Sequence, residues 1–306
     1  MAAEINKNEK NDLSTEDFAV AKVPSFAKIA WREIYSSKIS LISLFFFLAL
    51  TMTVFIWAVF IPEDATRINI LMLNRAPSAD HILGTDEFGR DMLSVLILGA
   101  RNSLSVSFIL TALSFIIGGL VGILLGFYGG HVDNVVMRFV DVISMLPALM
   151  VSIVLIVLVP EFNEFWLIAI LLVFGWIGPL RTIRTRALQQ GRLEYVHASK
   201  TLGTPNLVII FREVMPNLVS ILSGTFILTM AANIGVETGL TIIGFGLPPG
   251  TPSIGRLIMV ATNPAFIEHR TWQWAPALIL IVTISLSIVF VGQALNRAVD
   301  AKQRMK

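Results

Sequence analysis

The sequence has no cysteine, few charged residues and no motif for binding nucleotide phosphates. Without cysteine, the chain can form neither disulfides nor thiolate metal sites. Because a Gly-x-x-x-x-Gly-Lys-[Ser/Thr] loop is absent, we do not expect the chain to hydrolyse ATP itself. No Ser/His/Asp or Cys/His arrangement is plausible in its loops, and its 4 histidines are too scattered to predict a metal site. The sequence therefore indicates neither an enzyme nor a bound cofactor.

Apolar residues dominate what is present. The chain of 306 residues is 55% hydrophobic and 14% charged, with a mean hydropathy of +0.76. These apolar residues come in long blocks, which predicts an all-α integral membrane protein. The net charge of +2 is too small to indicate nucleic-acid binding. We expect residues 1–38 to be a polar tail, disordered over residues 1–22, followed by an apolar run too long for a cleaved signal peptide.

Six segments are apolar enough to be predicted as transmembrane helices. They cover residues 39–61, 102–128, 142–160, 165–180, 214–247 and 274–295. An extracytoplasmic loop of residues 62–101 separates the first helix from a core of residues 102–295, and residues 296–306 form a C-terminal tail. Three glycines spaced i, i+4, i+8 in the second segment predict close approach of another helix, or a hinge: Gly118, Gly122 and Gly126.

Lys and Arg residues predict the orientation in the membrane. With the N-terminus inside, the cytoplasmic segments hold 17 of them and the outer segments hold 6. Cytoplasmic segments of membrane proteins carry the excess of positive charge. Both termini and residues 181–213 are therefore predicted to be cytoplasmic.

Residues 181–213 form a basic segment that reads as a helix–turn–helix at the membrane surface. Gly203 is expected to end the first helix in a left-handed conformation, Thr204 to cap the second, and Pro205 to occupy its first turn. Four apolar residues at i, i+3, i+4 and i+7 then predict one buried face: Leu207, Ile210, Phe211 and Val214. By itself, this pattern also fits an amphipathic hairpin lying on anionic lipid.

The same segment resembles the cytoplasmic loop of ABC importer permeases. The loop motif in that family is Glu-Ala-Ala, three residues, Gly, nine residues, Ile, one residue and Leu-Pro. Here Gly203 and Pro216 match its spacing, while Glu213 and Met215 stand at the Ile and Leu positions. The three opening positions are His197, Ala198 and Ser199, and an acidic residue, Glu194, lies nearly one turn earlier.

Two further segments resemble one subgroup of that family, the C-type subunits of dipeptide, oligopeptide and nickel permeases. One comprises residues 81–91 and 99–104, before the second predicted helix, and the other comprises residues 237–255. Gly84 and Gly89 permit tight turns, so we interpret residues 81–91 as a structured outer loop without chemistry of its own. Its acidic residues lack the alternating oxygen ligands of a calcium loop, so we predict no metal there.

The resemblance, which covers about residues 81–300, implies a type I ABC importer permease in a bacterial inner or plasma membrane. It implies that a second, homologous permease subunit completes the translocation pathway and that an extracytoplasmic binding protein delivers the substrate. Two cytoplasmic ATPase subunits would bind ATP and Mg²⁺ and engage a coupling loop of residues 181–216. Peptides are the first substrate prediction, and nickel is the alternative. An ion-coupled secondary transporter and a non-transporting membrane scaffold are further alternatives.

One carboxylate lies inside an apolar stretch, at Glu237. An ionised group at the bilayer centre costs about 2.5–3.5 kcal/mol on insertion scales, so this side chain should face protein or water. It could line the translocation pathway or cap a broken helix. We favour the interpretation that Glu237 caps a broken helix, because Gly235 and Gly239 flank the residue.

Overall fold

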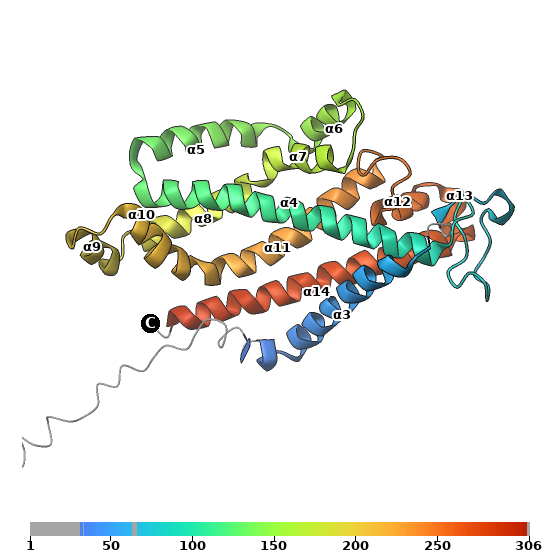
Figure 1. Ribbon diagram of the computed structural model, residues 1–306, viewed down its shortest axis with the longest axis horizontal. Coiled ribbons are helices and arrows are strands. Elements are labelled where there is room, and N and C mark those ends of the chain that lie inside the picture. The colour runs from blue at the N-terminus through green and yellow to red at the C-terminus, as the bar shows by residue number, and fades with distance from the viewer. Residues whose placement is uncertain (1–30, 33, 63–65, 305–306) are drawn as a thin grey trace, which may run out of the picture.

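The computed structural model describes residues 31–32, 34–62 and 66–304. The predicted tail of residues 1–22 lies outside them. Helices make up the described part, with one isolated bridge between Thr85 and Asp91 and no strand. They form an elongated bundle whose helices run mostly along the long axis (Figure 1). The all-α membrane fold predicted from the sequence is confirmed.

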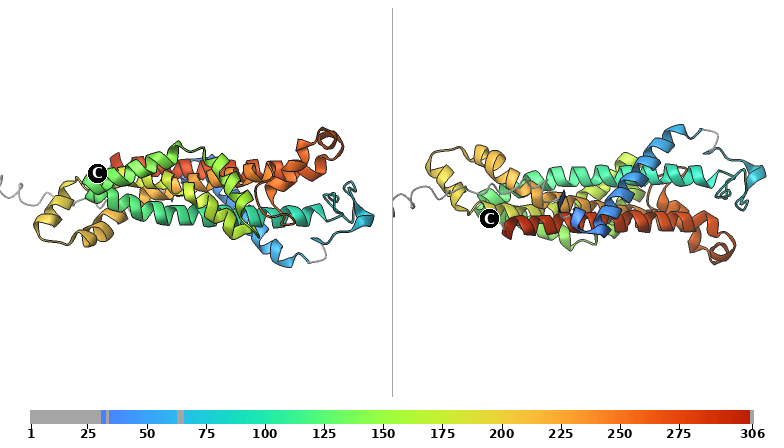
Figure 2. Two further views of the ribbon diagram at one scale, coloured as in Figure 1. Left: turned by 90° about the horizontal axis from the view of Figure 1, so that it is seen from above. Right: turned by 90° about the horizontal axis from the view of Figure 1, so that it is seen from below.

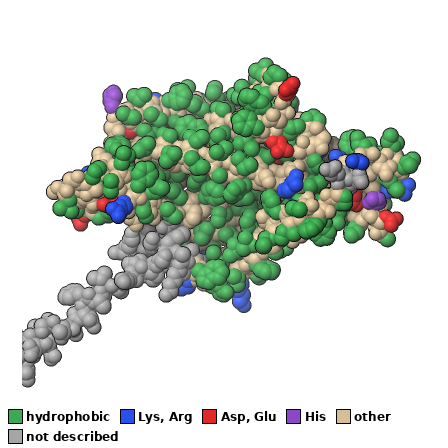
Figure 3. Space-filling view, viewed as in Figure 1, with side chains coloured by type: hydrophobic (Ala, Val, Ile, Leu, Met, Phe, Trp, Pro, Cys, Tyr) green, Lys and Arg blue, Asp and Glu red, His purple; other side chains and the backbone are tan. Residues whose placement is uncertain are grey.

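Four unbent helical segments are long and apolar enough to cross a membrane. The helices that contain them are α3 (Lys38–Phe60), α4 (Met92–Tyr128), α11 (Met215–Ile242) and α14 (Thr271–Arg304). Counting two bent helix pairs as one span each gives up to six among the described residues, which agrees with the number predicted. Charged side chains on the face seen in Figure 3 gather toward the two ends, while the middle is largely hydrophobic.

The two bent pairs owe their breaks to specific residues. Helix α5 (Gly130–Met145) meets α6 (Ala148–Leu158) at 79°. Pro147 lacks an N–H group and forces Leu146 into an extended conformation with ψ 137°, so the helix cannot continue. Helix α7 (Glu164–Gly175) meets α8 (Ile177–Gln190) at 40°, and Gly175 and Gly178 lie on either side of this bend.

Helix α4 is longer than the predicted span, because it begins at Met92 and not at Asn102. Asp91 caps it by accepting a hydrogen bond from the backbone N–H of Ser94 at 2.9 Å. Residues 92–101, the last part of the predicted outer loop, are therefore helical. The helix runs for 37 residues and contacts most of the bundle.

The three spaced glycines of α4 lie against α8. A Cβ atom on Gly118 would come within 2.5 Å of the Trp176 carbonyl oxygen, and one on Gly122 within 2.8 Å of the Leu180 carbonyl oxygen. A Cβ atom on Gly126 would overlap the Arg184 carbonyl oxygen. The predicted close helix approach is confirmed, and it fixes α8 against the bundle.

Short helices fill the two ends of the molecule. At one end lie α9 (Glu194–Thr201), α10 (Asn206–Ile209) and the π-helical turn η3 (Ile210–Val214). At the other end lie η2 (Ile70–Met72), α12 (Ile254–Met259), η4 (Val260–Thr262) and α13 (Pro264–His269). Figure 2 shows the loop after α3 and α13 at the end opposite α9, and the C-terminal end of α14 toward the α9 end.

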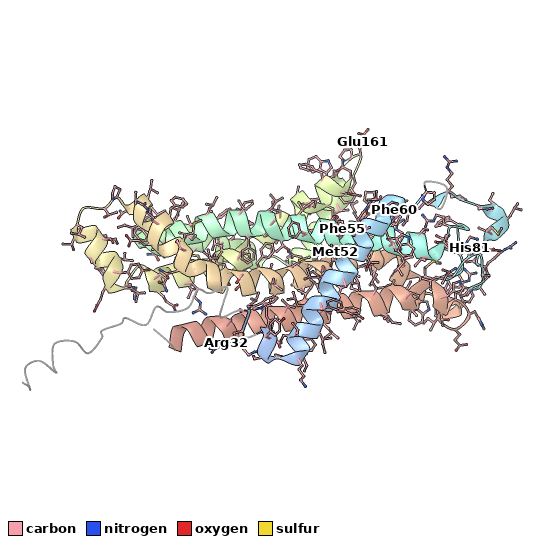
Figure 4. All side chains as sticks on the ribbon, turned by 60° about the horizontal axis from the view of Figure 1, so that its bottom comes forward. Arg32, Met52, Phe55, Phe60, His81 and Glu161 are labelled. Carbon is pink, nitrogen blue, oxygen red and sulfur yellow. The ribbon has the colours of Figure 1, made fainter. Side chains whose placement is uncertain are left out.

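Helix α3 crosses the bundle obliquely and exposes one apolar face. Met52, Phe55 and Phe60 follow one another along it, with Arg32 and His81 toward opposite ends (Figure 4). A shallow hollow of about 740 Å³ on this face is lined by residues of α3 alone. A surface made by one helix in a membrane protein is the expected contact with lipid.

Candidate functional site: the elbow between α8 and α11

The elbow, defined as residues 191–214, leaves the bundle after α8 and returns at α11. Gly203 ends α9 with φ +81°, and its N–H donates to the Lys200 carbonyl at 3.0 Å. The Thr204 N–H reaches back to the Ser199 carbonyl at 3.1 Å. The left-handed glycine predicted from the sequence is confirmed, and it turns the chain sharply toward α10.

The second half of the elbow differs from the prediction. Pro205, and not Thr204, is the residue before α10, and no side chain caps that helix. The helix then widens into the π turn η3, in which the Met215 N–H donates to the Ile210 carbonyl.

The widened turn changes which side chains face inward. Of the four residues predicted to share a buried face, Ile210 and Val214 are buried, while Leu207 and Phe211 are exposed. Ile209 takes a place in the interior instead. The predicted face was therefore half wrong, because one extra residue in the turn rotates the register.

The inner side of the elbow packs on the ends of the spanning helices. One hydrophobic cluster contains residues of the elbow together with residues of α4, α8 and α11. Its elbow members are Val196, Ile209, Ile210 and Val214, and its bundle members include Ile123, Ile183, Ala187 and Leu218. The Lys200 ammonium also lies 4.6 Å from the centre of the Phe127 ring of α4. These contacts make the elbow an extension of the bundle.

Hydrogen bonds add a polar layer to this packing. The Ser199 hydroxyl donates to Glu213 Oε1 at 2.8 Å, and the Asn217 amide donates to the Glu213 carbonyl at 2.9 Å. The Tyr195 hydroxyl donates to Gln190 Oε1 at 3.0 Å, and burial raises the pKa of this phenol. The polar contacts therefore link α8, α9, η3 and α11.

The outer side of the elbow is open. Glu194, His197 and Ala198 are exposed on α9, and Ser199 is half-buried beneath them. Gly203, Pro205 and Pro216 are also exposed. Three large apolar side chains, here called the apolar tip, are exposed on the same loop: Leu202 at 84%, Leu207 at 56% and Phe211 at 53%. A surface of this kind suits contact with another protein.

Two arginines of the basic segment are paired within the chain. Arg184 forms a two-pronged ion pair with Asp133 of α5, and Arg181 contacts Asp141 of α5 at 2.8 Å. These residues hold α5 along α8. The positive charge exposed on the elbow itself belongs to Arg192, Lys200 and Arg212.

Glu237 of α11 is fully buried, facing Ser103 of α4 and the turn of α11 on which α12 packs. Helix α11 continues past Gly235 and Gly239 to Ile242, so the carboxylate does not lie at a helix break. It accepts a hydrogen bond from the Thr241 hydroxyl at 3.0 Å and another from the Thr238 hydroxyl at 3.4 Å. Gly255 of α12 packs directly against Thr241. The residue thus lies at a junction of three helices near the end of α11.

The sequence reading missed a row of buried hydroxyls on α4, although its helical spacing was visible. Ser103, Ser107, Thr111 and Ser114 are all fully buried. Thr111 accepts a hydrogen bond at 2.8 Å from the amide of Asn233 on α11. Asn233 also lines, with Ser152 of α6, a cavity of about 170 Å³ among α4, α6, α7 and α11. A polar seam therefore runs through the membrane-spanning part of the bundle.

The outer loop of residues 81–91 is a closed structure. Asp86 accepts hydrogen bonds from the N–H groups of Phe88 and Arg90 and from Arg90 Nε, at 2.7–2.9 Å. The Thr85 carbonyl accepts a hydrogen bond from the Gln273 amide of α14 at 2.9 Å. Gly84 and Gly89 adopt φ values of +71° and +72°, so both predicted tight turns are present.

Comparison with known proteins identifies the family to which this fold belongs. Residues 118–305 match the family described as "Binding-protein-dependent transport system inner membrane component". The chain is 40% identical over 273 residues to the oligopeptide transport system permease protein OppC of Lactococcus lactis subsp. cremoris, covering 89% of this chain and 93% of the relative. It is 34% identical over 282 residues to the dipeptide transport system permease protein DppC of Bacillus subtilis, covering 92% and 87%.

A third relative spans nearly the whole chain. The oligopeptide transport system permease protein AmiD of Streptococcus pneumoniae is 34% identical over 314 residues, covering 97% of this chain and 98% of the relative. Among solved structures, a chain of the inward-facing MetNI methionine ABC transporter matches with a TM-score of 0.56 and 20% identity. That match covers 68% of this chain and 97% of the other, and it supports the fold. The chain belongs to the family of binding-protein-dependent transport system inner membrane components, the permease subunits of ABC transporters.

Proposed function

We propose that this chain is one of two permease subunits of an ATP-driven importer for peptides. In this proposal an extracytoplasmic binding protein delivers the peptide to the end of the bundle that carries α12 and α13. Two ATPase subunits work at the opposite end, where the elbow and the C-terminal end of α14 lie. Both termini are then cytoplasmic, as the distribution of Lys and Arg predicts.

The observation that carries the proposal is the two-sided construction of the elbow. Its inner side belongs to a hydrophobic cluster with α4, α8 and α11, while the apolar tip faces outward. A partner that moves the tip therefore also moves the ends of the spanning helices. Exposed Arg192 and Arg212 provide positive charge near this surface, which would steer an acidic partner toward it.

Peptide is favoured over nickel as the substrate. The relatives quoted above carry oligopeptide or dipeptide transport in their names. In the described residues, no group of three or more His, Cys, Asp or Glu side chains is placed to hold a metal ion. Nickel and nickel complexes remain an arm of the test because selection of the substrate can reside in the binding protein.

The test is ATP-dependent uptake by the complete complex reconstituted in vesicles. Peptides of graded length and nickel salts are supplied outside with the binding protein, and the ATP hydrolysed is measured in the same samples. We expect peptides to stimulate hydrolysis and to accumulate inside. Nickel uptake without peptide uptake would reject the peptide proposal, and absence of any associated ATPase would reject the importer.

A pair of charge-introducing substitutions tests the elbow as the docking surface. Phe211→Glu places a carboxylate on the apolar tip, and we expect it to weaken retention of the ATPase subunits about tenfold or more. Ile82→Glu is the matched control, because Ile82 is a 68% exposed apolar residue in the loop at the other end. Equal retention of ATPase by the two variants would place the docking surface elsewhere.

A further inference from the structure

Two elbow residues that depart from the family motif contact each other. Ser199 and Glu213 stand where that motif has Ala and Ile, and they are separated by 14 positions in the chain. The structure joins them through the 2.8 Å bond from the Ser199 hydroxyl to Glu213 Oε1. An Ala–Ile pair could make only an apolar contact at the same place. The two departures therefore form one polar interaction.

Removing only one partner of the Ser199–Glu213 hydrogen bond is expected to be unfavourable. Glu213 Oε2 is buried and has no hydrogen-bond partner within the described part of the chain, so the carboxylate relies on Oε1 for its contact with α9. Removing the Ser199 hydroxyl would leave a shielded carboxylate without that donor. An unpaired buried acceptor is far less favourable than a pair of apolar side chains of similar shape. Glu213 at this position is therefore favourable only when residue 199 provides a hydrogen-bond donor.

The Ser199–Glu213 hydrogen bond connects two helices that lie on different sides of the elbow's turn. Ser199 lies on α9, the helix that carries the exposed His197 and Ala198. Glu213 lies in the π turn that leads directly into α11, and its carbonyl accepts the Asn217 amide from the first turn of that spanning helix. The bond therefore bridges the exposed helix of the elbow to the beginning of α11.

We propose that Ser199 and Glu213 form a latch that fixes the orientation of α9 relative to α11. They are positioning residues: neither has to touch substrate or nucleotide, and both act by keeping the elbow stiff while it is pushed. This inference rests on the proposed function, because stiffness matters only if the elbow transmits movement from the ATPase subunits. A loosened latch lets α9 move without moving α11, so ATP is hydrolysed with less transport.

Substitutions at both positions separate the latch from simple loss of packing. Ser199→Ala removes the donor, and we expect the number of peptides imported per ATP hydrolysed to fall by up to about fivefold, the factor equivalent to one hydrogen bond. Glu213→Gln keeps an acceptor oxygen and should retain most of the coupling. The double variant S199A/E213I installs the apolar pair of the family motif and should recover coupling lost in Ser199→Ala.

The control is Thr201→Ala on the same helix. The Thr201 hydroxyl donates to the His197 carbonyl within α9 at 2.9 Å and makes no bond to α11 that the structure shows. This variant loses a hydroxyl of the same kind without opening the latch. Its coupling ratio should equal that of the unsubstituted protein.

A second measurement does not depend on transport. Because the chain has no cysteine, His197→Cys and Val219→Cys can carry paired spin labels on α9 and α11 of the assembled complex. Both positions are exposed. Ser199→Ala should broaden the distribution of distances between the labels, and Thr201→Ala should leave it narrow.

The outcomes distinguish the two proposals. If the unsubstituted complex imports no peptide but Ser199→Ala broadens the distances, the proposed function fails and the latch stands. If peptide is imported and Ser199→Ala matches Thr201→Ala in both measurements, the latch is overturned. Failure of S199A/E213I to recover coupling would also overturn it.

Discussion

The two ends of this molecule are constructed in opposite ways. At the outer-loop end, side chains cap the helices: Asp91 caps α4, Ser253 caps α12 and Asn263 caps α13. At the elbow end, α9 begins after Leu193 and α10 after Pro205, and neither has a capping side chain. The helices α4, α12 and α13 thus have capping side chains for their first N–H groups, and the two elbow helices α9 and α10 leave theirs to water or to a partner.

Exposed side chains follow the same division. The polar groups of residues 81–91 bond to one another and to α14, and Trp272 packs against Gly84. The elbow instead exposes the apolar tip and concentrates its internal bonds on the side facing the bundle. Residues 81–91, here called the clamp, therefore satisfy their polar groups by bonding to one another and to α14. The elbow instead packs firmly on its bundle side and exposes apolar side chains on the other side.

The largest expected effect comes from breaking the clamp at Asp86. The side chains of Asp86 and Arg90 are only 8% and 11% exposed, so removing the carboxylate leaves a guanidinium and two N–H groups without their acceptor. We expect Asp86→Ala to lower the free energy of unfolding by about 2–4 kcal/mol. Thermal unfolding of the purified complex measures this change.

The control for that variant is the neighbouring carboxylate. Glu87 is exposed, so Glu87→Ala should change the free energy of unfolding by less than about 0.5 kcal/mol. Equal thermal stability of the two alanine variants would contradict the view that this loop is a clamp.

An intermediate effect is expected from two glycines with similar backbones. Gly84 has φ +71° and Gly203 has φ +81°, so alanine at either position costs about 1 kcal/mol in conformational strain. A Cβ atom at Gly84 would also approach the Arg75 carbonyl oxygen to 2.5 Å, whereas nothing lies within 4 Å of a Cβ atom at Gly203. Gly84→Ala should therefore be the more destabilising, by roughly 1–3 kcal/mol.

This difference can be read from the thermal unfolding midpoints of the two variants. Gly203→Ala serves as the control for conformational strain alone, since its surroundings are open. A larger loss of stability at Gly203 than at Gly84 would reverse the proposed contrast between a crowded clamp and an open elbow.

Local chemistry explains which parts of the fold the sequence predicted. Gly203 was predictable because a left-handed residue after a helix strongly favours glycine, and the glycine row of α4 was predictable because its spacing matches one helix face. The apolar face of the elbow was not, since the π turn at Ile210–Val214 adds a residue that no periodic pattern contains. The same limit applies to Glu237, whose flanking glycines resemble a break although α11 is continuous.

Long-range pairs were equally hidden. Arg184 contacts Asp133 across 51 positions, and Ser199 contacts Glu213 across 14. In the sequence, Arg181 and Arg184 of α8 belong to a basic segment whose pattern indicates exposure to solvent. Only the packing of α5 along α8 reveals that part of this charge is neutralised within the chain. Partners distant in sequence are set by tertiary packing, which residue spacing does not record.

The smallest expected effect comes from introducing a capping side chain at the beginning of α9, like those of the helices at the outer-loop end. Leu193 precedes α9 with φ −79° and ψ 151°, the extended conformation in which Ser or Asp caps a helix. Leu193→Ser should therefore stabilise α9 by about 0.5–1 kcal/mol relative to Leu193→Ala, and slow the exchange of its amide hydrogens, measured by mass spectrometry. Asp91→Ala is the reciprocal change, and it should speed exchange in the first turn of α4. If Leu193→Ser and Leu193→Ala exchange at the same rate, the absence of a cap is not what distinguishes the elbow helices from those at the other end.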